Sequence, residues 1–186
     1  GNCDGFLANR SRVPFNLEMN ILIEDGALPQ DVDKVMYDFG YPMGPFAVAD
    51  LAGNDIGWEG RKRRYAANPD ARILPIPDAI CELGRFGQKT RAGWYDYKEG
   101  DRTPYPSDVV EKIISDHREK AGITPKSFTE EEILRRILFS SVNEICKILD
   151  EGIAYKATDA DVMWLNGFGF PRYRGGLMFW ADEIGV

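Results

Sequence analysis

The sequence is poor in the residues that most often carry acid–base and metal chemistry. Its 186 residues include one histidine, His117, and three cysteines, Cys3, Cys81 and Cys146. A histidine-based mechanism would therefore need His117 or a residue outside the chain. The cysteines are odd in number and far apart, which argues against a disulfide framework and favours a reducing compartment. No group of these residues has the spacing of a zinc site, so we expect no bound metal.

Long apolar runs and an excess of positive charge are also missing. No stretch approaches the roughly 20 apolar residues that span a bilayer, and the N-terminus lacks the basic start and apolar centre of a signal peptide. The 23 basic and 30 acidic residues give a net charge of −7, which disfavours a nucleic-acid partner. With 44% hydrophobic and 28% charged residues, the composition is typical of a globular protein and not of a disordered chain.

Complete motifs of the common nucleotide-binding and hydrolase folds are absent. Gly167-x-Gly169 begins like a dinucleotide-binding turn, but Arg172 stands at the third glycine position and no strand–helix–strand pattern surrounds it. There is no P-loop and no nucleophile elbow. Motifs alone therefore predict a globular protein without a complete active site.

Apolar spacing predicts a mostly helical chain. Residues Pro29–Phe39 carry an apolar stripe at helical spacing, and the proline suits a first helical turn. Phe6–Asp25 has the same character, and Pro14 inside it predicts a kink. A further helix is expected from Pro45 to Trp58.

The second half contains the clearest helix start. Thr129 is followed three residues later by Glu132, which is the pattern of a capping box, and a helix is expected to about Glu151. Thr158 with Asp161 repeats this pattern and predicts a shorter helix.

An internal repeat divides the helical chain into two copies. In both copies an acidic residue before glycine, an Asp-x-Asp, a Gly-aromatic-Pro and an Ala-Asp follow in the same order. The first set is Asp25-Gly26, Asp31-x-Asp33, Gly40-Tyr41-Pro42 and Ala49-Asp50, and the second is Glu151-Gly152, Asp159-x-Asp161, Gly169-Phe170-Pro171 and Ala181-Asp182. Two helical hairpins could need similar end residues by chance, but several matches in order favour duplication.

The repeat predicts how the chain is divided. We expect a first copy at 1–98, a connection with one helix at 99–127, and a second copy at 128–186 that stops short at Val186. Only residues 93–97 have strand character, and they are too few to build a sheet. The expected helix of the connection lies at about Ser107–Lys120.

Several motifs resemble one family. Gly5–Arg10, Phe39–Phe46 and Asp50–Gly53 resemble the C-terminal helical domain of 3-hydroxyacyl-CoA dehydrogenases, and Gly84–Tyr95 is similar to the end of its first copy. Gly167–Pro171 with Arg174–Gly176 resembles the second copy in multifunctional β-oxidation enzymes of the peroxisomal bifunctional type and their bacterial relatives. The resemblance implies an all-α fold: two tandem copies of this domain, which is similar to the C-terminal domain of 6-phosphogluconate dehydrogenase.

The resemblance implies the chemistry of an NAD-dependent dehydrogenase that oxidises a 3-hydroxyacyl-CoA in fatty-acid β-oxidation. In that family a separate domain holds NAD and the catalytic histidine, so this chain alone is expected to be inactive. The resemblance places Asn9 at the active-site asparagine and Lys89 at a lysine that approaches NAD. Met43 and Phe46 could line the acyl pocket, although both are more simply core residues.

The remaining candidates have structural interpretations. His117 matches no catalytic position of the family, and we interpret it as partly buried structure. The basic run Arg61–Arg64 could attract CoA phosphates, but a solvated helix end explains it as well. A non-catalytic helical interaction module derived from the family is the alternative function. The resemblance implies the peroxisomal matrix if the source is eukaryotic and the cytoplasm if it is bacterial.

The duplication predicts a pairing within the chain. Single-copy relatives associate through this helical domain, so a second copy could take the partner's position in an intramolecular pseudo-dimer. Aligning Asp25 with Glu151 places Asn9 opposite Arg135, which is longer and always charged, so the second copy is expected to be catalytically silent. The apolar side chains expected between the copies are Val32, Val35, Phe39, Ile137, Ile145 and Leu149.

Overall fold

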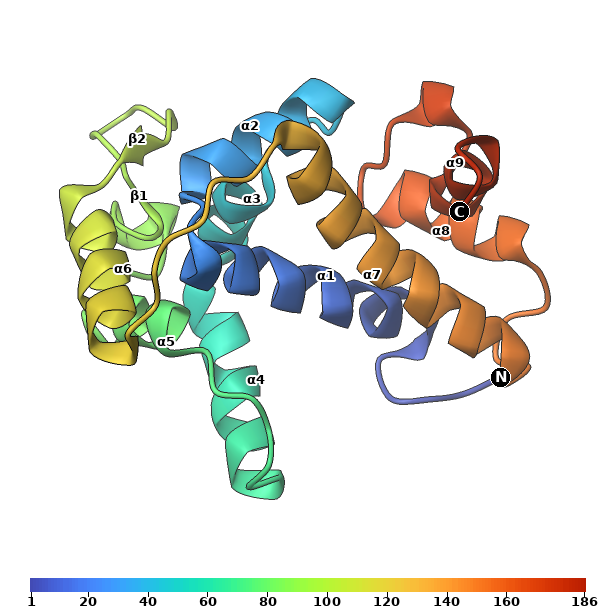
Figure 1. Cartoon of the computed structure of the whole chain (residues 1–186), viewed down its shortest axis with the longest axis horizontal. Helices are drawn as coiled ribbons and strands as arrows, with labels where there is room; N and C mark the ends of the chain where they lie inside the picture. The colour runs from blue at the N-terminus through green and yellow to red at the C-terminus, as the bar shows by residue number, and fades with distance from the viewer. The chain divides into compact units, whose positions relative to one another are not determined.

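The computed structural model describes the whole chain, residues 1–186, which is largely helical as predicted (Figure 1). Strand β1 (Tyr95–Asp96) pairs antiparallel with β2 (Tyr105–Pro106). None of the helices is both long enough and apolar enough to cross a membrane. The helices are α1 (Phe6–Asp25), α2 (Pro29–Phe39), α3 (Pro45–Ala52), α4 (Asn54–Ala67), α5 (Pro75–Glu82), α6 (Asp108–Ala121), α7 (Glu130–Asp150), α8 (Ala157–Gly167) and α9 (Leu177–Glu183), with short 3-10 helices η1 (Gln88–Thr90) and η2 (Arg172–Arg174).

The chain forms two compact units, and neither is a continuous stretch of sequence. Unit 1 comprises Gly1–Ile21, Val35–Pro42 and Phe128–Val186, and unit 2 comprises Leu22–Lys34 and Met43–Ser127. Helices α1 and α2 each contribute to both units. The units therefore cut across the two sequence copies, and α6, which was expected in a connection, belongs to unit 2.

Unit 2 is built on α3 to α6 and the strand pair. Ile80 of α5 and Ile114 of α6 are almost fully buried in its core. Arg118 of α6 is buried as well, and its guanidinium donates hydrogen bonds to the carbonyls of Ile23 (2.5 Å) and Ala27 (2.7 Å). Carbonyls at a helix end lack partners within the helix, so Arg118 caps the end of α1.

Unit 1 is built on α7 to α9, with the first part of α1 beside α7 (Figure 1). The predicted capping box is confirmed: the Glu132 N–H donates to the Thr129 hydroxyl, and the Thr129 N–H donates to the Glu132 carboxylate. Ile137 of α7 and Trp164 of α8 are fully buried. The Trp164 indole donates to the hydroxyl of Ser11 (3.2 Å), which joins α8 to α1.

Two predicted helix boundaries are wrong. The helix expected from Pro45 to Trp58 breaks at Gly53, whose φ of 103° suits glycine and would strain other residues. Helix α8 begins before Thr158, which therefore caps nothing, because the chain already turns helical after Lys156. Helix α1 runs through Pro14 as one element.

Candidate functional site

Asp33 of α2 holds the start of α3. Its carboxylate accepts hydrogen bonds from the N–H groups of Phe46 (2.8 Å) and Ala47 (2.9 Å) and from the hydroxyl of Tyr95 (2.9 Å). Gly44 precedes α3 and offers no side-chain cap, so Asp33 supplies the acceptor that the helix N-terminus needs. Burial raises the pKa of Asp33 to about 6, and the three hydrogen bonds oppose that shift.

The two residues predicted near an acyl pocket differ in exposure. Phe46 is 0% exposed, and its ring centroid lies 4.4 Å from that of Trp94. The predicted contact of Phe46 with an acyl chain is therefore not supported, because its ring has no exposed surface and belongs to the core of unit 2. Met43 is partly exposed, so its contact with a substrate stays a prediction.

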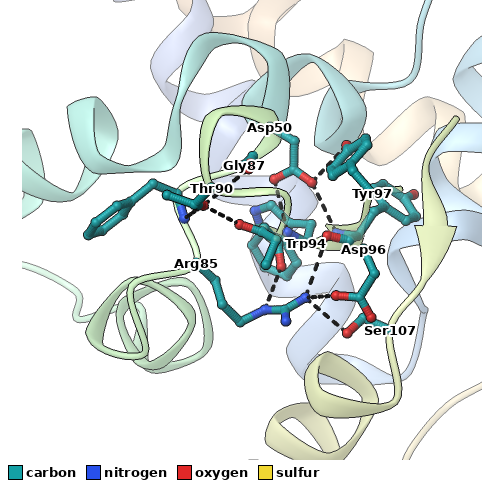
Figure 2. A network of polar contacts seen from close by, with 12 residues as sticks. Asp50, Arg85, Gly87, Thr90, Trp94, Asp96, Tyr97 and Ser107 are labelled. Carbon is teal, nitrogen blue, oxygen red and sulfur yellow. Dashed lines mark hydrogen bonds and ion pairs between the residues drawn. The ribbon is translucent and has the colours of Figure 1, made fainter. Parts of the chain in front are cut away.

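A buried carboxylate organises the segment that follows α5 (Figure 2). Asp50, 1% exposed, accepts hydrogen bonds from the N–H groups of Trp94 (2.9 Å) and Tyr95 (3.0 Å), the Tyr97 hydroxyl (2.9 Å) and the Asn54 amide (2.7 Å). Burial raises the pKa of Asp50, and these donors offset the cost of burying a charge. Asp50 thus fixes a distant stretch of chain to α3.

Arg85 fixes the other side of the same segment, as Figure 2 shows. Its guanidinium donates to the Gly93 carbonyl (3.0 Å), the Asp96 carboxylate (2.7 Å) and the Ser107 hydroxyl (2.9 Å). Neither Asp50 nor Arg85 was predicted from the sequence to hold this segment. The available signal was a single aspartate inside the otherwise apolar stretch Pro45–Ala52.

Lys89 is presented by this fixed segment, on η1. Its side chain is 50% exposed, and its Nζ donates to the Asp55 carboxylate at 2.5 Å, which lowers the pKa of Asp55. The neighbouring helices expose large apolar side chains, Leu51 at 53% and Ile56 at 68%. A Cβ placed on Gly53 would lie 3.0 Å from the Lys89 Nζ. Lys89 therefore reaches the junction of α3 and α4, where apolar surface is exposed.

Asn9 lies in the exposed first part of α1, and its carboxamide forms no hydrogen bond within the chain. Its neighbour Arg10 is held instead, by Glu144 (2.7 Å) and by both oxygens of Glu151 (2.6 and 2.8 Å). The Asn9 carboxamide is thus free to meet a group from outside the chain. Asn9 belongs to unit 1, whereas Lys89 belongs to unit 2.

His117 and the basic run Arg61–Arg64 have structural settings. His117 is partly buried on α6. Arg61 pairs with Asp78 at 2.6 Å, with both side chains mostly buried, and so joins α4 to α5. Arg63 donates to the carbonyl of Glu59 in its own helix. Because these side chains already have partners within the chain, the run is not a set of free cations available to bind phosphate.

A second aspartate, in unit 1, repeats the arrangement around Asp33. Asp161, 6% exposed, accepts hydrogen bonds from the N–H groups of Met178 (2.7 Å) and Phe179 (3.3 Å) at the start of α9. Burial raises the pKa of Asp161. Asp161 was predicted to pair with Thr158 at the start of α8. Instead, its carboxylate accepts from N–H groups of α9, which begins 16 residues later in the chain.

The residues present do not fit a complete NAD site. A dinucleotide fold presents pyrophosphate to a glycine-rich turn between a parallel strand and a helix. Here the only sheet is the antiparallel pair β1–β2, and Gly167–Arg172 follows a helix. Lys89 could add one contact to NAD held elsewhere, but the chain offers no glycine-rich turn between a parallel strand and a helix for the pyrophosphate.

The sequence matches a known family and several long relatives. Residues 5–97 match the 3-hydroxyacyl-CoA dehydrogenase, C-terminal domain. Over its whole length the chain is 43% identical to the peroxisomal bifunctional enzymes of Danio rerio and Homo sapiens, and it covers 28% of each. It is 38% identical to the peroxisomal fatty acid beta-oxidation multifunctional protein of Oryza sativa subsp. japonica, of which it covers 26%. The chain thus spans little more than a quarter of these relatives.

Solved structures share the fold. The dehydrogenase part of multifunctional enzyme 1 from C. elegans is 30% identical, with a TM-score of 0.73 over 95% of this chain and 39% of that one. The 3-hydroxybutyryl-CoA dehydrogenase from Escherichia coli K12 gives a TM-score of 0.67 over 97% of this chain and 53% of that one. Because the latter identity is 18%, that likeness concerns the fold alone.

Proposed function

We propose, because this chain belongs to the 3-hydroxyacyl-CoA dehydrogenase family, that it is the helical, substrate-side part of an NAD-dependent enzyme of fatty-acid β-oxidation. The enzyme would oxidise a 3-hydroxyacyl-CoA to a 3-oxoacyl-CoA. The observation that carries the proposal is the match of residues 5–97 to the C-terminal domain of that family. The peroxisomal and glyoxysomal names of the eukaryotic relatives support a peroxisomal location for a eukaryotic source.

In this proposal the chain positions groups and does not supply the base. NAD, when bound, accepts the hydride, and a histidine of the domain that carries NAD takes the hydroxyl proton. The unpaired carboxamide of Asn9 offers a donor and an acceptor to a substrate oxygen or to that histidine, and it keeps its charge state at any working pH. Leu51 and Ile56 offer apolar area to the domain that carries NAD, with Lys89 at the edge.

The chain alone is expected to show no dehydrogenase activity. It contains no dinucleotide-binding unit, and His117, its only histidine, is partly buried on α6. The check is oxidation of NADH in the presence of acetoacetyl-CoA, using a preparation whose circular dichroism is that of a folded helical protein. Turnover above the enzyme-free background would contradict the assignment of the base to another domain.

The finer proposal is that the chain holds two copies of one helical domain, at 1–98 and 128–186. The surroundings of two aspartates support it. Asp33 caps α3 through two successive N–H groups, and Asp161 caps α9 in the same way. In both cases a glycine two residues before the first N–H donor, Gly44 or Gly176, packs so closely on the aspartate that a Cβ would collide with it. Duplication of one domain would produce such equivalent contacts in the same order along the chain.

Reciprocal ion pairs in unit 1 support a pseudo-dimer of the two copies. Aligning Asp25 with Glu151 sets Arg10 against Arg136 and Glu18 against Glu144. Arg10 pairs with Glu144 at 2.7 Å, and Arg136 pairs with Glu18 at 3.0 Å. Each copy therefore gives its arginine to the glutamate of the other, as twofold symmetry requires.

The Gly-aromatic-Pro motifs at 40–42 and 169–171 show the same reciprocity. A Cβ on Gly40 would lie 2.9 Å from Pro171, and a Cβ on Gly169 would lie 3.3 Å from Pro42. The two middle rings, Tyr41 and Phe170, meet edge to face with centroids 5.9 Å apart. Because a short tether raises the effective concentration of a partner to about millimolar, such a pairing need not depend on protein concentration.

Reversing the charge of one partner in a reciprocal ion pair is expected to destabilise the protein. Reversing the charges of both partners together should restore most of the stability. Arg136→Glu and Glu18→Arg should each destabilise the protein by about 1 kcal/mol, because both side chains are about 70% buried and like charges would meet. The double variant should regain most of that loss. Urea unfolding measures the three stabilities. The control is Arg135→Glu, whose arginine pairs only with Glu131 of its own helix. Additive losses in the double variant would argue against the pairing.

A further inference from the structure

A cavity of about 500 Å³ in unit 2 is lined by four cationic side chains. They come from η1, from the residue that follows it, and from the turn that joins β1 to β2. These cations are Lys89, Arg91, Lys98 and Arg102, and Asp101 is the one carboxylate among the lining residues. This concentration of positive charge contrasts with the net charge of −7 of the whole chain.

The local carboxylate, Asp101, is occupied by hydrogen bonds, which lower its pKa together with the nearby charge of Lys98. Lys98 and Arg102 form no ion pair. The Asp101 carboxylate accepts hydrogen bonds from the Thr103 N–H (2.8 Å) and the Tyr105 hydroxyl (2.9 Å). The Lys98 ammonium lies over the Tyr105 ring, 4.2 Å from its centroid, and forms no ion pair. Arg102 is exposed and forms neither a hydrogen bond nor an ion pair. Lys98 and Arg102 are therefore available to an anion in the cavity.

The other two cations are paired, Lys89 with Asp55 at 2.5 Å and Arg91 with Glu99, and only the Arg91 pair is exposed on both sides. The Arg91 carbonyl accepts from the Tyr97 N–H at 3.0 Å, within the segment that Asp50 and Arg85 hold in place (Figure 2). The Arg91 guanidinium pairs with Glu99 at 2.9 Å, but these side chains are 58% and 81% exposed. Exposed ion pairs contribute little because water and salt screen them. A phosphate group could displace Glu99 at small cost.

We propose that this cavity binds the phosphate groups of a nucleotide polyphosphate. Guanidinium and ammonium groups are the side-chain groups that bind phosphate best, and four residues that carry them line this one cavity. A concave site suits a small polyanion better than a membrane surface, and the acidic chain disfavours nucleic acid. Naming CoA and NAD as sources of the phosphates depends on the proposed function, whereas the affinity for phosphate does not.

The test is calorimetric titration of the chain with CoA, NAD and pyrophosphate at low ionic strength. We expect saturable binding of CoA, of NAD or of both, weakened by added salt. Arg102→Ala and Lys98→Ala should each weaken binding about fivefold, the upper range for one solvent-exposed charge pair. Glu99→Gln should strengthen it about twofold, because it removes the competitor for Arg91. The control is Arg63→Ala, an equal change of charge on α4, outside the cavity.

The outcomes distinguish two questions: which ligand supplies the phosphate groups, and whether the cavity binds a phosphate ligand at all. Binding of CoA alone, or of NAD alone, identifies which ligand supplies the phosphates, and binding of pyrophosphate alone contradicts the proposed nucleotide ligand. The inference is overturned if none of the three binds, if Arg63→Ala weakens binding as much as Arg102→Ala, or if only anionic phosphatidylserine vesicles bind. No activity is measured, so an inactive enzyme would count against the proposed function and leave this inference intact.

Discussion

Replacement of Asp50 by alanine is expected to destabilise unit 2 by about 4 kcal/mol. The change leaves the N–H groups of Trp94 and Tyr95 and the hydroxyl of Tyr97 buried without an acceptor. Each unsatisfied buried donor costs about 1–3 kcal/mol, and relaxation of the segment recovers part of the sum. Urea unfolding followed by circular dichroism and tryptophan fluorescence measures the loss.

The matched control is Asp182→Ala. The internal repeat aligns Asp182 with Asp50, but Asp182 is exposed at the end of α9 and its side chain has no hydrogen-bond partner within the chain. Its removal should change stability by less than about 0.5 kcal/mol. Equal effects of the two substitutions would show that the Asp50 network contributes little. A large loss with Asp182→Ala alone would show that the contacts of the two aspartates are described wrongly.

Replacement of Asn9 by alanine, in the protein that joins this chain to its NAD-binding domain, is expected to lower kcat about a hundredfold. Loss of one positioned polar group in an active site costs about 3 kcal/mol of transition-state stabilisation. Stability should hardly change, because the Asn9 carboxamide is exposed and forms no hydrogen bond within the chain. Steady-state kinetics with a 3-hydroxyacyl-CoA and NAD, together with thermal unfolding, separate the two effects.

The control for Asn9 is Arg135→Ala, at the aligned position of the second copy. Arg135 is 55% exposed and pairs only with Glu131, so kcat should stay within about twofold of the unchanged enzyme. A kcat of Asn9→Ala within the same range would show that Asn9 is structural. A loss with Arg135→Ala equal to that with Asn9→Ala would contradict the silent second copy.

Local signals predicted the helices that their own residues determine. Helix α2 begins and ends where its apolar stripe and Pro29 indicated, and α7 begins after the capping box at Thr129. The boundaries that failed depend on other parts of the chain. Gly53 ends α3 although the apolar pattern continues, and Asp161 serves α9 and not its own helix. Periodicity carries no information about such distant partners.

The residues proposed for the site came from the resemblance and not from local patterns in the sequence. Asn9 and Lys89 came from family motifs, and the exposed positions of their side chains suit the proposed roles. Phe46 was interpreted from its place after a turn, and its complete burial became apparent only with Trp94 packed against it. The Asp50 network joins residues 44 to 47 positions apart. A single sequence gives no signal for such pairs beyond a lone charge in an apolar helix.

The most direct test of the central claim is NADH formation from a 3-hydroxyacyl-CoA by the longer protein, with and without residues 1–186. We predict turnover when the NAD-binding domain is joined to this chain, and loss of turnover when residues 1–186 are removed although the remaining domain still binds NAD. Unchanged turnover without these residues, or none in the folded longer protein, would contradict the assignment to a dehydrogenase. Either result would favour a non-catalytic interaction module.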